Sequence, residues 1–197
     1  PYYAEALDRD PDHSLVNTQL GIKALKAMDW DRAAKHLEKA VNRVSLNQMR
    51  TKYGEPLYYY GVALRKLGKI EESIDMLNRA TWSAGWKASA HHTLAEIASV
   101  QGDFERALNH LERSLETNAQ NRRAQGLKVA LLRKQNQLDQ AKSLAEQILE
   151  NHPMHLQVRN ELMKIAELQG ASKEATKQLE ALEGIVKEEV ETYLELA

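Results

Sequence analysis

The sequence predicts an all-α protein built as a solenoid of antiparallel helix pairs. Residues 86–119 show the repeating unit, because they read as two amphipathic helices joined by the turn Gln101-Gly102-Asp103. Apolar side chains recur at helical spacing in both halves, namely Leu94, Ala95, Ala98 and Val100, then Phe104, Ala107, Leu108, Leu111 and Leu115. Neither helix can bury its apolar side alone, so this unit must stack on copies of itself.

A fixed step pattern of small residues locates the copies. Ala95 is followed by Ala107 after 12 residues and by Ser114 after a further 7. The same steps begin at four other residues along the chain, Gly21, Gly61, Val129 and Met163. Successive starting residues are 40, 34, 34 and 34 residues apart. A period of 34, with small residues where two helices cross closely, is typical of tetratricopeptide repeats.

On these residues the chain resembles the tetratricopeptide repeat (TPR) family over nearly its whole length. The resemblance implies a right-handed α-solenoid with a concave groove lined by the first helix of each pair. Residues 1–11 are then expected to end a helix of a preceding repeat, and residues 184–197 to form a C-terminal capping helix. Five repeats are expected between residues 12 and 183, at approximately 14–53, 54–87, 88–121, 122–155 and 156–183.

Two irregularities mark the N-terminal part. Asp10-Pro11 ends a helix, because proline cannot continue the hydrogen-bonded ladder, and the chain lacks an initiator Met, so we expect a longer parent protein. Between Val41 and Glu55, six extra residues lengthen the first period to 40, and Gly54 with Pro56 marks a new helix start. The extra residues are interpreted either as a lengthened helix and loop or as a loop that contacts a partner.

Aromatic residues gather in the second repeat and after it. Three consecutive tyrosines cannot share one helix face, so we expect Tyr60 in the core and Tyr58 and Tyr59 toward the groove. Trp82 and Trp86 lie four residues apart around Gly85. They are interpreted either as a packed staple between two repeats or, since indole rings are favoured binding anchors, as contacts for a partner.

The later repeats differ in detail. Asn136 takes the turn position that Gly68, Gly102 and Gly170 occupy elsewhere, and Asn tolerates the left-handed conformation better than most residues. Gly184 either breaks the last helix or only weakens a continuous one. The expected cap turns an apolar stripe inward, made of Ile185, Val186, Val190, Tyr193 and Leu194.

Composition and motifs exclude several function classes. Lys and Arg total 27 against 28 Asp and Glu, which argues against a nucleic-acid binder, and no apolar run reaches the length of a membrane span. The absence of Cys excludes thiol catalysis and leaves the compartment open. No catalytic or phosphate-binding motif is present, and adjacent His91 and His92 point to different helix faces. We therefore predict no enzyme, no metal and no cofactor in these residues, and the sequence assigns no oligomeric state.

The candidate site is the groove that the TPR resemblance implies. Chaperone-binding TPR domains hold a carboxylate with a set of Lys and Asn residues, but the matching places here carry other residues, such as Thr18, Ile22 and Tyr59. Arg122, Arg123 and Lys128 belong to a basic group interpreted as a solvated face or an anion site. The groove candidates are Tyr58, Tyr59, Arg65, Trp82, Trp86, His92, Glu96, Arg123, Arg133 and Asn160.

A second resemblance rests on Trp82, Trp86, His92 and residues 114–121. With these residues the chain is similar to the C-terminal TPR array of large bacterial proteins that carry an upstream β-sandwich domain associated with carbohydrate metabolism. Two hypotheses follow. The first is a non-enzymatic scaffold that binds a protein or peptide in its groove. The second is an accessory module that packs on the missing upstream domain of a carbohydrate-active protein.

Overall fold

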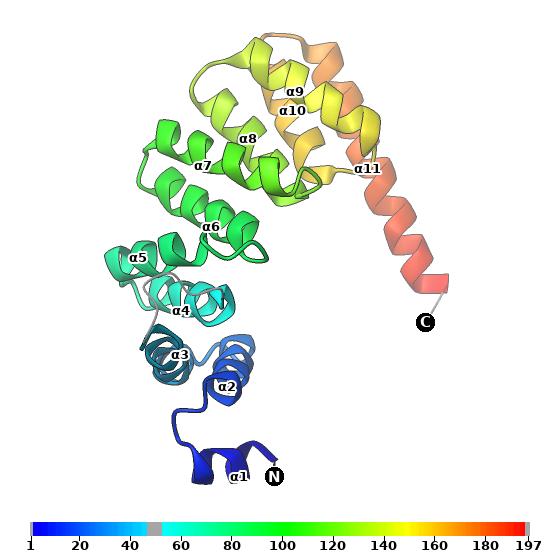
Figure 1. Cartoon of the computed structure of the whole chain (residues 1–197). Coiled ribbons are helices and arrows are strands. Elements are labelled where there is room, and N and C mark those ends of the chain that lie inside the picture. Colours follow the sequence, from blue (N-terminus) through cyan, green and yellow to red (C-terminus); the bar gives the residue numbers. More distant parts are fainter. Residues whose placement is uncertain (1, 47–52, 196–197) are drawn as a thin grey trace. The chain divides into compact units, whose positions relative to one another are not determined.

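The computed structural model describes residues 2–46 and 53–195, with side chains as far as residue 187. Within these ranges the regular structure is entirely helical, as predicted (Figure 1). The chain divides into two compact units, residues 1–119 (unit 1) and residues 120–197 (unit 2). The helices are α1 (Tyr2–Arg9), α2 (Ser14–Lys26), α3 (Trp30–Ser45), α4 (Gly54–Lys66), α5 (Ile70–Ala80), α6 (Lys87–Val100), α7 (Phe104–Thr117), α8 (Arg122–Lys134), α9 (Leu138–Asn151), α10 (Leu156–Leu168) and α11 (Ser172–Glu195).

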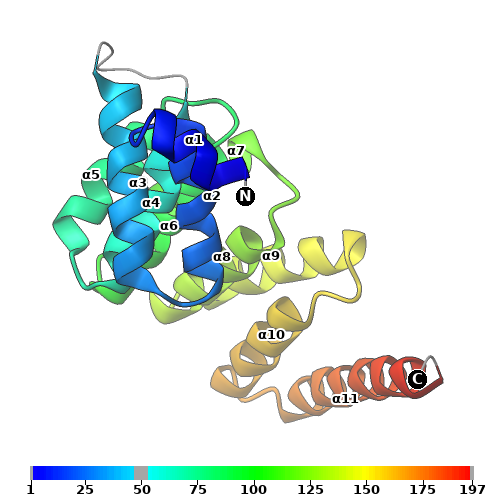
Figure 2. The same ribbon diagram turned by 90° about the horizontal axis from the view of Figure 1, so that it is seen from below.

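Unit 1 is a stack of helix pairs. After the short α1, helix α2 packs on α3, α4 on α5 and α6 on α7. Consecutive pairs stack on one another through contacts of α3 with α4 and of α5 with α6 (Figures 1 and 2). The first helices also contact one another, α2 with α4 and α4 with α6. We call the surface of α2, α4 and α6 the first-helix face of unit 1.

Small residues allow the two helices of a pair to cross closely. A Cβ atom at Gly61 would lie 2.8 Å from Cγ of Leu77, which is fully buried. The hydroxyl of Ser73 crosses the same gap and donates to the carbonyl oxygen of Gly61 over 2.7 Å. Ala95 and Ala107 are also fully buried. The predicted role of the small residues is therefore confirmed in these pairs.

One predicted core position is wrong. Val100 is exposed, although its spacing placed it near the apolar face of Leu94 and Ala98. The reason is its position, since Val100 is the last residue of α6 and lies beside the turn at Gln101 and Gly102.

The turns between paired helices use one left-handed residue. Gly68, Gly102 and Gly170 have φ angles of 78°, 80° and 71°, and Asn136 has a φ angle of 60°. The prediction that Asn136 takes the glycine position is confirmed. Met28 occupies this turn position in the first pair, with a φ angle of 58°. The sequence did not predict a left-handed conformation for Met28. The left-handed conformation strains Met28, because its Cβ atom then lies close to the following carbonyl oxygen.

Unit 2 continues the same construction. Helix α8 packs on α9, α9 on α10 and α10 on α11, and the first helices α8 and α10 also contact each other. Val129, Val158 and Ile165 are fully buried at these contacts. A second close approach occurs between α8 and α10, where a Cβ atom at Gly126 would lie 2.5 Å from Cδ of Gln157.

Of the two interpretations of Gly184, the structure has the continuous helix. Residues 184–195 belong to α11, which begins at Ser172 and runs through Gly184 without a break. A glycine inside a helix costs only about 1 kcal/mol, so neighbouring residues can hold the helix together. Ile185 is buried but Val186 is exposed, and the side chains of Val190, Tyr193 and Leu194 lie outside the described ones.

The lengthened first period lies partly outside the described residues. Helix α3 ends at Ser45 and α4 begins at Gly54, and residues 47–52 between them are outside the described ranges. The two interpretations of these extra residues both stay predictions.

Candidate functional site

Trp86 is held at the start of α6 by a tight turn. Its backbone N–H donates to the carbonyl oxygen of Ser83 over 3.0 Å, and Ser83 N–H donates to Ala80 over 3.1 Å. The turn lies against the start of α4, where a Cβ atom at Gly54 would be 2.5 Å from Cβ of Ser83 and 3.1 Å from Cβ of Trp86. The missing side chain of Gly54 therefore allows α4 to approach the turn that carries Trp86.

Three aromatic rings meet at this point and form the aromatic cluster, Tyr58, Tyr59 and Trp86. Tyr58 stacks on Trp86 with ring centroids 5.0 Å apart and planes inclined by 29°. Tyr59 meets Trp86 edge-on at 5.2 Å, and the two tyrosine rings lie 5.3 Å apart. Such offset and edge-to-face pairs are the favoured arrangements of aromatic rings. The cluster therefore fixes the indole of Trp86 from one side.

A pocket of about 650 Å³ opens beside Trp86. Two of its apolar side chains are well exposed, Leu15 by 60% and Tyr53 by 67%. We call this cavity the Trp86 pocket. It is formed by the N-terminal part of α2, the end of α3, the start of α4 and the N-cap of α6, and its lining residues are Ser14, Leu15, Thr18, Arg43, Val44, Tyr53, Gly54, Glu55, Pro56 and Trp86.

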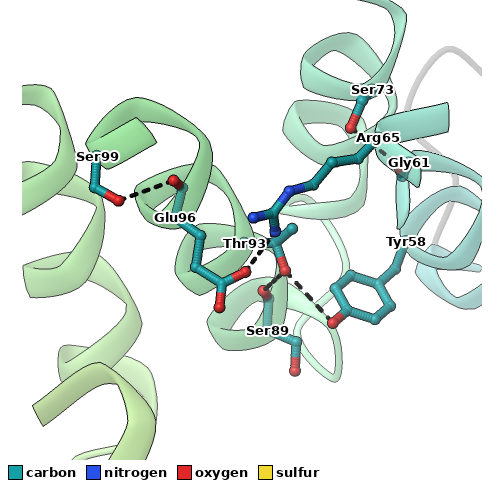
Figure 3. A network of polar contacts seen from close by, with 8 residues as sticks. All are labelled: Tyr58, Gly61, Arg65, Ser73, Ser89, Thr93, Glu96 and Ser99. Atoms are coloured by element: carbon teal, nitrogen blue, oxygen red, sulfur yellow. Dashed lines mark hydrogen bonds and ion pairs between the residues drawn. The ribbon is translucent and has the colours of Figure 1, made fainter. Parts of the chain in front are cut away.

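Polar contacts continue from the aromatic cluster along α4 and α6 (Figure 3). The hydroxyl of buried Thr93 lies 3.1 Å from the carbonyl oxygen of Ser89, to which it donates, and 3.5 Å from the hydroxyl of Tyr58. One turn further along, the guanidinium of Arg65 donates to a carboxylate oxygen of Glu96 over 2.5 Å. Figure 3 shows the Arg65 side chain reaching from α4 toward α6. This ion pair neutralises both charges and ties neighbouring first helices together.

Burial shifts the pKa values of Tyr59 and His91 in opposite directions. Burial, assisted by the negative charge of Glu55 and by Tyr58, raises the pKa of Tyr59 above its usual value, so Tyr59 stays a neutral hydroxyl at physiological pH. His91 lies on the opposite side of α6, where its Nδ1 atom is 3.1 Å from Nδ1 of His110 on α7. Burial lowers the pKa of His91 to about 4, assisted by His110. His91 is therefore neutral at physiological pH and belongs to the helix crossing.

Unit 2 carries three predicted candidates, and one of them is in an ion pair. Arg133 Nε donates to a carboxylate oxygen of Glu161 over 2.6 Å, and Lys164 Nζ contacts the other oxygen of Glu161 at 3.0 Å. Arg123 is exposed on α8, and Asn160 is partly buried on α10. Sequence reasoning did not identify Glu161 as a site residue. The available signal was Arg133, which repeats the position of Arg65 two periods later and so indicates an acidic partner on the next first helix.

The structure brings some of the predicted residues together and leaves others apart. Tyr58, Tyr59 and Trp86 form one cluster, whereas Arg65 and Glu96 pair with each other. His92 lies partly buried on α6, and Trp82 is exposed in the turn outside the lining of the pocket. Sequence reasoning did not identify five pocket residues, Leu15, Arg43, Val44, Tyr53 and Glu55. The signal for the residues near position 54 was the break in the helical pattern at Gly54 and Pro56.

Two further features of the described residues concern metal binding and membrane spans. Among residues 2–46 and 53–187, no group of three or more His, Cys, Asp or Glu side chains is placed to hold a metal ion. In the described part of the chain, every helix is too short or too polar to span a lipid bilayer.

Comparisons with known proteins agree with this architecture. Residues 128–186 match the family model described as tetratricopeptide repeat. Across the chain, similar solved structures include YrrB, a TPR protein, with a TM-score of 0.71 and 17% identity over 94% of this chain and 92% of that chain. The chain therefore has the fold of a TPR solenoid, and its residues 128–186 match the TPR family. A structure of MamA gives a TM-score of 0.73 and 16% identity over 90% of this chain and 94% of MamA.

Curated relatives resemble a shorter part of this chain. The cell division cycle protein 16 homologs of Homo sapiens and Mus musculus are each 26% identical to it over 117 residues, which is 58% of the chain. The matched region is 19% of each relative, so the chain spans less than a fifth of the length of the curated relatives it matches.

Proposed function

We propose that this TPR array is a non-enzymatic scaffold module that binds a protein or peptide on the first-helix face of unit 1. The observation that carries the proposal is the Trp86 pocket, which lies at one end of that face and has an indole wall. TPR proteins are typically scaffolds for protein–protein interaction, and this proposal places the contact surface on α2, α4 and α6.

The geometry of the pocket suits a peptide side chain. Its volume of about 650 Å³ falls within the range of ordinary ligand pockets, and its wall is aromatic and apolar with a few polar groups. Trp and Tyr are the residues that most often contribute large binding energies at protein interfaces. Because Tyr58 and Tyr59 hold the indole of Trp86 in place, little conformational entropy is lost when a ligand contacts it.

The ion pair between Arg65 and Glu96 on the first-helix face also bears on the class of partner. Arg65 is neutralised by Glu96, so this arginine is not a free anion site. A partner that relies on a row of acidic residues therefore finds little charge to match here. One of the similar structures, YrrB, is described as having an unusual peptide-binding site, which supports the peptide class for the ligand.

The test is a selection from a phage-displayed library of random dodecapeptides with the 197-residue chain, followed by titration calorimetry of the selected peptides. We expect Trp86→Ala to lower the affinity at least about tenfold, as truncation of a central aromatic residue does. Trp82→Ala is the matched control, because Trp82 lies in the same turn but outside the pocket lining, and it should change the affinity less than about twofold. Equal losses in both variants, with both folded by circular dichroism, would reject this location.

A second function, the accessory module, is supported by another observation. Tyr2, Tyr3 and Leu15 are exposed on α1 and α2. Exposed apolar side chains on neighbouring helices are suited to contact with another domain. Hydrogen exchange tests this hypothesis on the 197-residue chain alone and on the longer protein with an upstream domain that the hypothesis requires. Protection of α1 and α2 only in the longer protein would support domain packing, and identical exchange in both would contradict it.

A further inference from the structure

We infer that the Trp86 pocket takes a basic side chain, lysine or arginine, from the bound peptide, with the carboxylate of Glu55 as its ion-pair partner. This inference rests on the proposed function, because it names the chemistry that the peptide presents to that pocket. Its basis is the balance of charges around the pocket together with the chemistry of its walls.

The pocket is lined by two side chains of opposite charge, Arg43 and Glu55. A guanidinium nitrogen of Arg43 lies 4.0 Å from a carboxylate oxygen of Asp10, so the cation already has a counter-charge. The Glu55 carboxylate makes no ion pair and no side-chain hydrogen bond with any residue in the described ranges. Counted over the described residues, the unmatched charge of the pocket is therefore negative.

Glu55 is less accessible to water than a fully exposed surface glutamate. It is partly buried in the first turn of α4, and its charge is close enough to Tyr59 to contribute to the raised pKa of that hydroxyl. A cation that enters the pocket would meet both this carboxylate and the aromatic side chains of Trp86 and Tyr53. Ion pairing and cation–π attraction then act in the same direction.

The apolar walls select a long side chain over a small cation. Leu15, Val44 and Pro56 line the same pocket and can contact a chain of methylene groups. Lysine and arginine carry such a stem and place their charge at its end, so the stem can lie along apolar surface while the charge meets a polar partner. A free metal or ammonium ion would use only the carboxylate and would leave these walls without contacts.

Glu55 also has an ordinary structural role, which the test must separate from binding. An acidic residue in the first turn of a helix is stabilised by the helix dipole. Glu71 has the same place in α5 that Glu55 has in α4, the second residue of the helix, and it lies outside the pocket lining. Glu71→Gln therefore removes the dipole interaction alone and is the matched control for Glu55→Gln.

The experiment begins with the peptides selected by the full chain from the random dodecapeptide library. We expect them to share a lysine or arginine, and replacement of that residue by methionine should weaken binding to the unmodified chain about tenfold. Glu55→Gln should weaken the basic peptide by a similar factor and remove the difference between the basic peptide and its methionine version. Glu71→Gln should leave both affinities as they are.

Two kinds of failure are distinguishable. If no peptide is selected, or if the selected peptides ignore Trp86→Ala, the proposed function itself is wrong. If peptides bind and require Trp86 but share no basic residue, or if Glu55→Gln affects both peptide versions equally, the proposed function stands and this inference is overturned. Selection of a shared acidic residue would instead assign the ligand contact to Arg43.

Discussion

Gly54 and Ser83 approach so closely that a side chain at position 54 has no room. A Cβ atom at Gly54 would lie 2.5 Å from Cβ of Ser83 and 2.9 Å from its Oγ. This contact joins the start of α4 to the turn that carries Trp86. The shape of the Trp86 pocket therefore depends on the missing side chain of Gly54.

Gly54→Ala should destabilise the chain by about 1 to 3 kcal/mol, because overpacking forces the backbone or the turn to move. The measurement is the free energy of unfolding in urea. Gly85→Ala is the control in the same turn, since a Cβ atom there meets nothing within 4 Å, and we expect a change below about 0.5 kcal/mol. Equal effects of the two substitutions would contradict the close approach.

The two interhelical ion pairs should differ in their contribution to stability. Arg133 and Glu161 have side chains that are 15% and 8% exposed, compared with 30% and 37% for Arg65 and Glu96. Glu161→Gln leaves Arg133 buried without its counter-charge and should cost about 2 to 3 kcal/mol. Glu96→Gln should cost less than about 1 kcal/mol because water screens this pair. Urea unfolding of both variants measures the difference, and the opposite order would show that burial does not decide it.

Stability should fall in mildly acidic solution because of His91. Burial lowers its pKa from the usual 6.5 to about 4, so between these values the unfolded chain binds a proton that the folded chain excludes. The free energy of unfolding therefore decreases as the pH drops through this window, by at most about 1.4 kcal/mol per pH unit for this one group. His110, whose pKa is also lowered by burial, acts in the same direction.

The measurement is the urea midpoint as a function of pH, for the unmodified chain and for His91→Asn. The variant should show a shallower decrease between neutral pH and about pH 5, because it lacks the group that binds the extra proton. An unchanged pH dependence in His91→Asn would assign the effect to other groups.

Met28→Gly should stabilise the chain. Met28 has a φ angle of 58° and is exposed, so glycine relieves strain without removing a buried contact. We expect a gain of about 1 kcal/mol in the free energy of unfolding, the difference between the relieved strain and the larger entropy of an unfolded glycine. Asn136→Gly is the comparison, and its gain should be smaller because Asn tolerates this conformation. A loss of stability in Met28→Gly would show that the methionine side chain contributes a contact.

The architecture could be predicted from the sequence because the constraint is local and repeated. Close crossing of paired helices requires small residues at fixed steps, and Gly61, Ala95 and Ala107 meet that requirement. The turn position of Asn136 was predictable for the same reason. Gly184 was not decisive, since its cost of about 1 kcal/mol is too small to break a helix by itself.

The site could be predicted only in part. Helical spacing predicted that Tyr58 and Tyr59 face the groove side of the first helices. Their contact with Trp86 could not be predicted, because it depends on how the turn before α6 lies against Gly54. The pocket combines ends of several helices, and residues such as Glu55 have no periodic signal. Glu161 was missed because pairing with Arg133 depends on the rotation of α10 relative to α8.

The most direct test of the central claim, that a peptide binds beside Trp86, is the fluorescence of a chain in which Trp86 is the only tryptophan. The sequence has three, so Trp30→Phe and Trp82→Phe together leave one reporter in the pocket. We predict that a selected peptide shifts its emission, with the same affinity that calorimetry gives for this variant. Calorimetric binding of the peptide with no change in Trp86 emission would contradict the claim.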